Sequence, residues 1–129
     1  MKALRIILFL ILLVSTLVGS VHASIRFNVM DLDAAIALAK QDNKYVFVDT
    51  YASWCGPYKV MNRVFEESEV SNYFNANFIN VKIDMEGPPG DKRLYDYEGV
   101  WLPTLLIIDG SGMVLSKIDQ LISGSELVK

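Results

Sequence analysis

The sequence predicts an α/β domain in which helices cover both faces of one central, mixed β-sheet. Segments of strand character alternate along the chain with segments of helical character, an order typical of a sheet covered by helices. The last two strands are separated only by Asp109-Gly110-Ser111-Gly112, and a turn this short joins antiparallel strands. Hydrophobic residues make up 52% of the 129 residues, which is enough for a buried core.

The first 23 residues have the pattern of a secretory signal peptide. A positively charged start precedes Ile6–Val18, a nearly unbroken apolar run that is short for a membrane span. Small residues in Val21-His22-Ala23 predict cleavage after Ala23. An uncleaved anchor is the alternative interpretation. We expect a mature domain of residues 24–129 that is secreted or periplasmic and leaves the membrane once the signal is cleaved.

The first elements of the domain follow from capping and periodicity. Ile25–Val29 predicts a short extended arm. Asp31 can cap a helix that ends at Asp42-Asn43, because its carboxylate can accept hydrogen bonds from exposed amides of the first turn. The apolar residues of this helix recur at helical spacing: Leu32, Ala35, Ile36 and Ala39. The β-branched and aromatic segment Tyr45–Tyr51 predicts a buried strand.

Two further helices and a strand are predicted in the middle of the domain. A helix should begin near Cys55-Gly56-Pro57, since proline is tolerated in a first helical turn. Ser68 is expected to cap the next helix, which carries Val70, Tyr73 and Phe74. The strand Phe78–Asp84 has an alternating pattern.

The last third of the domain predicts a loop, a helix and a hairpin. After the loop at residues 87–90, Asp91–Glu98 is expected to be helical. Leu105–Asp109 and Met113–Ile118 are expected to form the hairpin. The segment Ser123–Lys129 can supply only a stub of helix, so we expect one sheet face to be partly bare or covered by a partner.

Composition and charge exclude several classes of protein. The chain has one Cys and one His, which excludes an intramolecular disulfide and a Cys/His zinc cluster. Signal cleavage removes two basic residues and no acid, so the net charge moves from −3 to −5. An acidic domain without a basic run is a poor partner for nucleic acid. Cleavage also removes His22, so imidazole catalysis is excluded in the mature domain.

Three acidic residues around the glycine- and proline-rich loop are interpreted as solvated rather than as a metal site. Asp84, Glu86 and Asp91 lack the ligand spacing of a calcium-binding loop. The sequence calls for no metal and no other cofactor.

The chemistry is expected in the segment Trp54-Cys55-Gly56-Pro57-Tyr58-Lys59, which follows a predicted strand and opens a helix. Partial positive charge at a helix N-terminus stabilises a thiolate, and the thiolate is the nucleophile in disulfide exchange. The alternative interpretation is a buried, inert cysteine.

Two blocks of sequence resemble the thioredoxin superfamily, with secreted bacterial thioredoxin-like domains as the nearest type. Val46–Pro57 is similar to the second strand and active-site turn of that family, and Val100–Leu106 resembles its proline loop and the following strand. The two blocks stand in the right order, and the resemblance covers most of the mature chain. It implies a thioredoxin-like fold, here with a truncated C-terminal helix.

Position by position, the resemblance also implies roles. Cys55 matches the attacking cysteine, Asp49 the buried acid that can pass a proton, and Pro103 the cis-proline of the substrate-facing loop. The other residues expected to contact substrate are Trp54, Gly56, Pro57, Tyr58, Trp101 and Leu102.

The second cysteine of the family falls at Tyr58, and this departure leaves three functions open. Tyrosine cannot attack a mixed disulfide, so a dithiol cycle cannot run within this chain. The first hypothesis is exchange through Cys55 alone, on a protein or peptide disulfide, with an external thiol resolving the adduct. The others are a binding module for peptide or partner protein, without turnover, and a structural domain with a vestigial cysteine.

Overall fold

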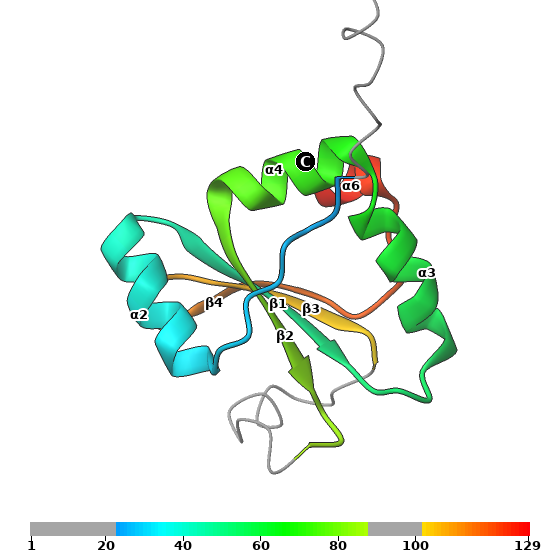
Figure 1. Cartoon of the computed structure of the whole chain (residues 1–129), viewed down its shortest axis with the longest axis horizontal. Helices are drawn as coiled ribbons and strands as arrows, with labels where there is room; N and C mark the ends of the chain where they lie inside the picture. The colour runs from blue at the N-terminus through cyan, green and yellow to red at the C-terminus, as the bar shows by residue number, and fades with distance from the viewer. Residues whose placement is uncertain (1–22, 88–101) are drawn as a thin grey trace, which may run out of the picture.

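A computed structural model describes residues 23–87 and 102–129 of the chain. In this part of the chain, a four-stranded sheet has the order β2-β1-β3-β4, with helices on both faces (Figure 1). The strands are β1 (Tyr45–Tyr51), β2 (Phe78–Asp84), β3 (Thr104–Ile108) and β4 (Val114–Ile118). β1 pairs in parallel with β2 and antiparallel with β3, and β3 pairs antiparallel with β4. The predicted α/β class with a mixed sheet is therefore confirmed.

Helix α2 (Leu32–Asp42) begins and ends where the sequence predicts. The Asp31 side chain accepts a hydrogen bond from the Ala34 amide at 2.7 Å. Asn43 adopts a left-handed conformation with φ of 52°, in which its amide bonds to the Ala39 carbonyl and ends the helix.

Helix α3 (Gly56–Phe65) has Cys55 as its N-cap residue and Pro57 in its first turn, as predicted. The prediction that Ser68 caps the next helix is wrong. Helix α4 (Ser68–Asn77) has Glu67 as its N-cap, and Ser68 is already helical. The extended backbone falls at Glu67, one residue before the predicted cap, and the Glu67 carbonyl accepts the first hydrogen bond of α4, from the Ser71 amide at 2.9 Å.

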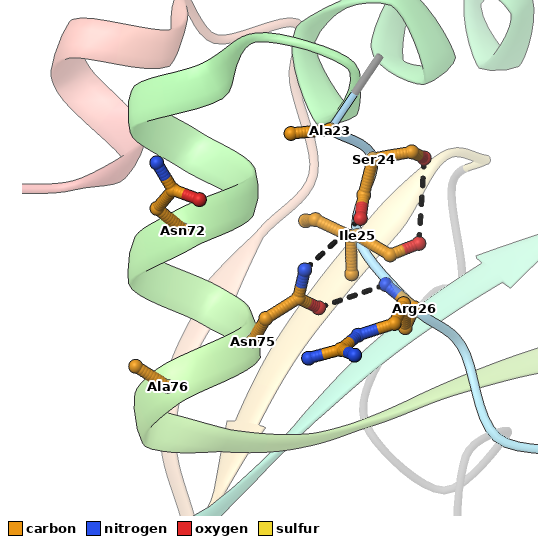
Figure 2. Close-up of a pocket in the computed structure, with 7 residues that line it drawn as sticks. All are labelled: Ala23, Ser24, Ile25, Arg26, Asn72, Asn75 and Ala76. Atoms are coloured by element: carbon orange, nitrogen blue, oxygen red, sulfur yellow. Dashed lines mark hydrogen bonds between the residues drawn. The ribbon is translucent and has the colours of Figure 1, made fainter. Parts of the chain in front are cut away.

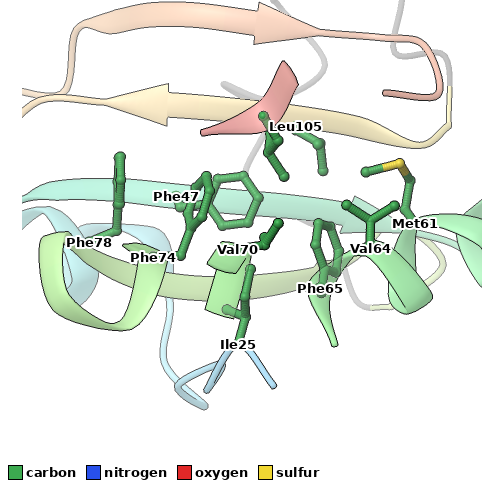
Figure 3. Close-up of a cluster of buried hydrophobic side chains, with 10 residues drawn as sticks. Ile25, Phe47, Met61, Val64, Phe65, Val70, Phe74, Phe78 and Leu105 are labelled. Carbon is green, nitrogen blue, oxygen red and sulfur yellow. The ribbon is translucent and has the colours of Figure 1, made fainter. Parts of the chain in front are cut away.

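Two hydrophobic clusters lie on opposite faces of the sheet, because successive side chains of a strand point to opposite faces. Val46 and Val48 of β1 pack toward α2. Phe47 points to the other face, where it is centred among aromatic rings and lies 4.4 Å from the Phe74 ring centroid (Figure 3). The cluster around Phe47 comprises Ile25, Met61, Val64, Phe65, Val70, Phe74, Phe78, Leu105 and Leu127.

Strand β2 is more deeply buried than its alternating pattern suggests. Its first four residues, Phe78 to Val81, are all buried. Ile79 and Val81 pack with α2, whereas Phe78 packs with α4 on the opposite face. The first half of the strand is therefore covered on both faces, which its alternating pattern alone does not indicate.

The predicted N-terminal arm is extended and docked on α4 and β2. The Ile25 amide bonds to the Phe65 carbonyl at 3.0 Å, and the Ile25 side chain is buried in the Phe47 cluster. The Asn75 side chain bridges the arm, accepting from the Arg26 amide at 2.8 Å and donating to the Ser24 carbonyl at 3.0 Å (Figure 2). The Asn28 amide bonds to the Asn80 carbonyl at 2.8 Å, in an isolated parallel bridge between Asn28 and Val81 that extends the sheet at the edge of β2.

The C-terminal part of the described chain forms the predicted hairpin and a short helix. Asp109 lies in the turn rather than in β3, because its carboxylate accepts hydrogen bonds from the Ser111 and Met113 amides. Helix α6 (Gly124–Leu127) is closed by a capping box between Ser123 and Glu126. It lies on the same face as α3 and α4, with Leu127 in the Phe47 cluster (Figure 1). No helix among the described residues is long and apolar enough to cross a membrane.

Candidate active site

Cys55 lies at the start of α3, just beyond the end of β1. Its amide bonds to the Ala52 carbonyl at 3.1 Å and closes a tight turn between strand and helix. The side chain is only 4% exposed, and its Sγ donates a hydrogen bond to the Leu102 carbonyl at 3.4 Å. The structure therefore places the thiol at the helix start, against the loop that precedes β3.

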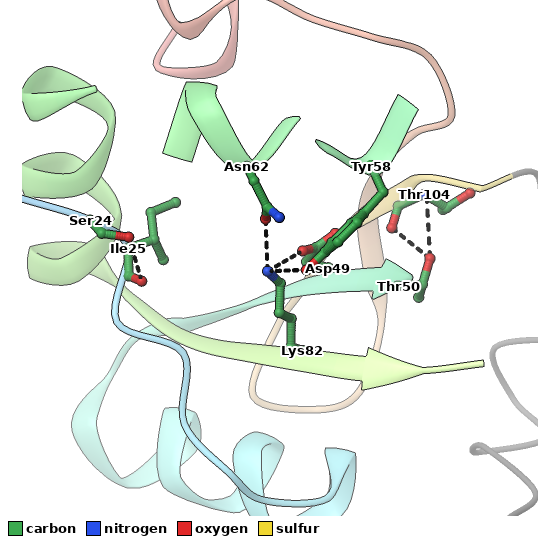
Figure 4. Close-up of polar contacts among 8 residues, drawn as sticks. All are labelled: Ser24, Ile25, Asp49, Thr50, Tyr58, Asn62, Lys82 and Thr104. Carbon is green, nitrogen blue, oxygen red and sulfur yellow. Dashed lines mark hydrogen bonds and ion pairs between the residues drawn. The ribbon is translucent and has the colours of Figure 1, made fainter. Parts of the chain in front are cut away.

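The proline loop is held beside the cysteine by the pairing of β1 with β3. The Leu102–Pro103 peptide bond is cis, and Pro103 is buried. Thr50 Oγ1 donates to the Thr104 carbonyl at 2.8 Å and accepts from the Thr104 amide at 3.3 Å (Figure 4). This pair joins the ends of the two strands, which brings the Leu102–Pro103 loop to the turn that carries Cys55.

Asp49 is fully buried, on the face of β1 that also carries Phe47. Its nearest charge is Lys82, whose Nζ lies 3.4 Å from Asp49 Oδ2. Among the described residues, neither carboxylate oxygen accepts a hydrogen bond, so the lysine compensates the carboxylate through its charge. Burial raises the pKa of Asp49 from 3.8 to about 6, and the ammonium of Lys82 limits the rise.

Lys82 holds this buried acid in a larger polar cluster that the sequence analysis missed. The parallel register sets Lys82 directly beside Asp49 on the neighbouring strand. Its ammonium donates to Tyr58 Oη and to Asn62 Oδ1, both at 2.9 Å (Figure 4). It also lies 4.7 Å from the centre of the Phe27 ring. A lysine between the apolar residues Val81 and Ile83 of a strand was the signal available in the sequence.

Tyr58 does not stand free at the position of the missing cysteine. Its hydroxyl is bound to Lys82, and its ring stacks on Tyr51 with centroids 5.2 Å apart. Burial raises the pKa of Tyr51, and the nearby carboxylate of Asp84 adds to the effect. We expected Tyr58 to contact substrate, but its hydroxyl is already hydrogen-bonded to Lys82 and its ring is packed on Tyr51.

Three other expected contact residues lie at the surface around Cys55. Trp54 is 72% exposed, and Gly56 and Pro57 are exposed as well. They are therefore free to touch a second molecule. Trp101 lies outside the described residues, as does the predicted helix Asp91–Glu98.

A contact between Ser53 and Glu86 fastens the cysteine turn to the end of β2. One oxygen, Glu86 Oε2, accepts from the Ser53 amide and from the Ser53 hydroxyl, each at 2.7 Å. These two bonds lower the pKa of Glu86. The Glu86 side chain is exposed, in agreement with its interpretation as solvated, and it is also bonded across 33 residues of chain, which the sequence analysis did not foresee. Among the described residues, no three acidic, His or Cys side chains are grouped to hold a metal ion.

These features define a class of protein: a thioredoxin-fold domain with one cysteine at the first turn of α3 and a cis-proline loop against it. A family model described as thioredoxin-like matches residues 28–110, well over half of the chain. The chain belongs to the thioredoxin-like family, which confirms the resemblance found in the sequence.

Individual relatives agree with this placement. The chain is 30% identical to the thioredoxin of Buchnera aphidicola subsp. Schizaphis graminum over 78 residues, which cover 60% of this chain and 68% of the relative. A solved structure of a candidate disulphide-isomerase from Bacteroides thetaiotaomicron is 36% identical, with a TM-score of 0.72 over 82% of this chain and 88% of that one. A thioredoxin from Thermus thermophilus, 21% identical with a TM-score of 0.67, covers 80% of this chain and 81% of that one and supports the fold.

Proposed function

We propose that this protein carries out thiol–disulfide exchange through Cys55 alone, on disulfides of proteins or peptides, with an external thiol completing each cycle. The observation that supports this most strongly is the placement of Cys55 at the start of α3, with its Sγ 3.4 Å from the Leu102 carbonyl beside the cis-proline. Relatedness to thioredoxins and to a candidate disulphide-isomerase points to the same chemistry.

The cycle has two exchanges that conserve electrons. In the first, the Cys55 thiolate attacks one sulfur of a substrate disulfide; a Cys55–substrate disulfide forms, and the other substrate sulfur leaves as a thiolate that takes up a proton. In the second, an external thiolate attacks the substrate sulfur of this adduct; a disulfide forms between the external thiol and the substrate, and the Cys55 thiolate is released. When the second attacker is another thiol of the same substrate, the net result is isomerisation.

Asp49 is the proposed proton carrier for these steps. Its pKa of about 6 lets it hold or release a proton near neutral pH. Residues 24–129 contain no histidine that could take this role. Lys82 then acts as a positioning residue, because its ammonium lies between Asp49 and Tyr58.

We further propose that the domain works outside the cytoplasm, in a secreted or periplasmic setting. The support is the signal-like pattern of residues 1–23. Disulfide substrates persist in such oxidising compartments.

The test is to trap and then resolve the adduct. Purified protein is incubated with oxidised glutathione or with a disulfide-bonded peptide, and its intact mass is measured. We expect one adduct per chain on Cys55, released by reduced glutathione, and none on Cys55→Ser. Reshuffling of a mispaired two-disulfide peptide, measured with the same variants, then reports turnover.

The exchange proposal fails if the wild-type protein forms no adduct under conditions in which an unfolded peptide containing the same cysteine forms one. The second candidate is a binding module for a peptide or partner protein. The burial of Cys55 and the engagement of its Sγ by Leu102 favour this reading over exchange if no adduct forms. Binding of an extended peptide that is unchanged in Cys55→Ser would then establish it.

A further inference from the structure

The turn that carries Cys55 is joined to the end of β2 by a clamp, defined here as the two hydrogen bonds from Ser53 to Glu86 Oε2. Both bonds measure 2.7 Å, and both are made to a carboxylate. Hydrogen bonds to an ionised acceptor are shorter and about twice as strong as neutral ones. The clamp is therefore a firm tie, although both residues are exposed.

Glu86 is itself held in place from two directions. The Met85 amide continues the β1–β2 pairing by bonding to the Tyr51 carbonyl at 2.9 Å. The Glu86 amide donates to Asp84 Oδ1 at 2.9 Å. These two bonds fix the backbone at Glu86, so its side chain extends to Ser53 from a fixed position at the end of β2.

The clamp is linked to the Cys55 thiol through the short turn of residues 52–55. Ser53 is the residue between Ala52, which is buried, and Trp54, which is exposed. Ala52 in turn accepts the Cys55 amide bond that closes the turn. A hydrogen bond that holds Ser53 therefore also holds the Ala52–Cys55 turn. This turn positions Cys55, the N-cap residue of α3, and its Sγ.

We propose that Glu86 is a positioning residue for Cys55, which holds the turn of Ala52–Cys55 so that Sγ rests against the Leu102 carbonyl. The proposal concerns where the sulfur is held, and its consequence for exchange rests on the proposed function. A mobile turn would expose the sulfur more often, yet would hold it less well for the in-line attack that disulfide exchange needs.

The two consequences have opposite signs, and this makes a sharp test. In the full chain, Glu86→Ala is expected to raise the rate of Cys55 alkylation by iodoacetamide several-fold, because the sulfur is less protected. It is expected to lower the rate of exchange with a disulfide-bonded peptide about tenfold. Hydrogen exchange of the Ser53 amide, followed by NMR, should accelerate about tenfold as its acceptor is lost.

Four further variants separate the clamp from general destabilisation. Glu86→Gln keeps an oxygen that can accept from Ser53 and should restore most of the wild-type rates. Ser53→Ala removes only the hydroxyl bond and should fall between wild type and Glu86→Ala; added to Glu86→Ala, it should change little more. Glu66→Gln removes one exposed acidic charge at the end of α3 and should leave all three rates unchanged.

Urea unfolding of each variant shows that the rates are those of native protein. Wild-type rates of alkylation and of Ser53 exchange in both Glu86→Ala and Ser53→Ala would overturn the proposal. The same would follow if alkylation and peptide exchange changed together in one direction. If alkylation and Ser53 exchange respond as expected but no variant, including wild type, exchanges with the peptide, the clamp is supported and the proposed function fails.

Discussion

Burying the charged form of Asp49 lowers the free energy of unfolding, and the size of this loss depends on pH. Its pKa is 3.8 in an exposed chain and about 6 in the folded protein, so the folded state binds its proton more tightly. Between these two values the folded state holds more protons than the unfolded state, and stability therefore falls as the pH rises through this window. Above about pH 6 the loss is complete, at about 3 kcal/mol for a single group shifted this far.

The first prediction is that Asp49→Asn stabilises the protein at pH 7. The amide keeps the shape of the side chain without a buried charge, so the free energy of unfolding should rise by up to about 3 kcal/mol. Below pH 4, where the wild-type acid is protonated as well, the gain should disappear. Urea unfolding at pH 4 and pH 7 checks both values; an equal effect at the two pH values would contradict the assignment.

The second prediction concerns the lysine that limits this cost. Lys82→Met removes the ammonium 3.4 Å from Asp49 Oδ2, so the pKa of Asp49 should rise above about 6. Titration of the Asp49 carboxyl carbon by NMR measures this directly. Lys59→Met, which removes an exposed charge from α3, serves as the matched control and should leave the titration almost unmoved.

The third prediction restores the cysteine that Tyr58 replaces. Tyr58→Cys should form a disulfide with Cys55 and reduce insulin in the presence of dithiothreitol, and adding Cys55→Ser should abolish this activity. The substitution gives up the bond to Lys82 and the stacking on Tyr51, so a cost of about 2 kcal/mol is expected. A folded variant that forms the disulfide but shows no activity above wild type would favour the binding module.

At the scale of elements, α6 approaches α4 so closely that one position admits no side chain. A Cβ added at Gly124 would overlap with Glu67 Oε2 and lie 2.9 Å from Val70 Cγ2. The glutamate end can swing away, but Val70 is fully buried and cannot. The close approach places Leu127 in the same cluster as Val70.

The fourth prediction follows from this contact. Gly124→Ala should destabilise the protein by about 1–3 kcal/mol, because the added methyl group overpacks the junction of α6 and α4. Gly56→Ala is the matched control: a Cβ at Gly56 meets nothing within 4 Å, and alanine favours the helix, so stability should be unchanged or slightly raised. Thermal unfolding of both variants distinguishes the two cases.

Most elements could be predicted because their causes are local. The bounds of β1 and β2, the Asp31 cap and the start of α3 at Cys55 all follow from residues within one or two turns. The cap assigned to Ser68 was wrong because the break between α3 and α4 falls one residue earlier, at Glu67, whose carbonyl accepts from the Ser71 amide. The burial of both faces of β2 could not be predicted, because it depends on what covers each face, which no single strand encodes.

At the scale of the whole molecule, the residues of the candidate site could be predicted from the sequence, but the contacts that hold them in place could not. Cys55, Asp49 and the Leu102–Pro103 loop could be named because two sequence blocks carry a family resemblance. The contacts that hold them could not be foreseen, because Lys82 reaches Tyr58 across 24 residues and Glu86 reaches Ser53 across 33. Such pairs depend on the register of β1 against β2, which is set only when the sheet forms.

Among residues 23–87 and 102–129, the sheet separates two hydrophobic clusters that have no residue in common. The fifth prediction is that substitutions on the two sides act independently: the losses of stability caused by Phe74→Leu and by Leu32→Ala should add within about 0.5 kcal/mol in the double variant. Urea unfolding of the four proteins closes this cycle. Additivity would mean that the α2 side can be redesigned in a library of its own, for instance to raise heat tolerance, while the side that carries Asp49 keeps its native packing.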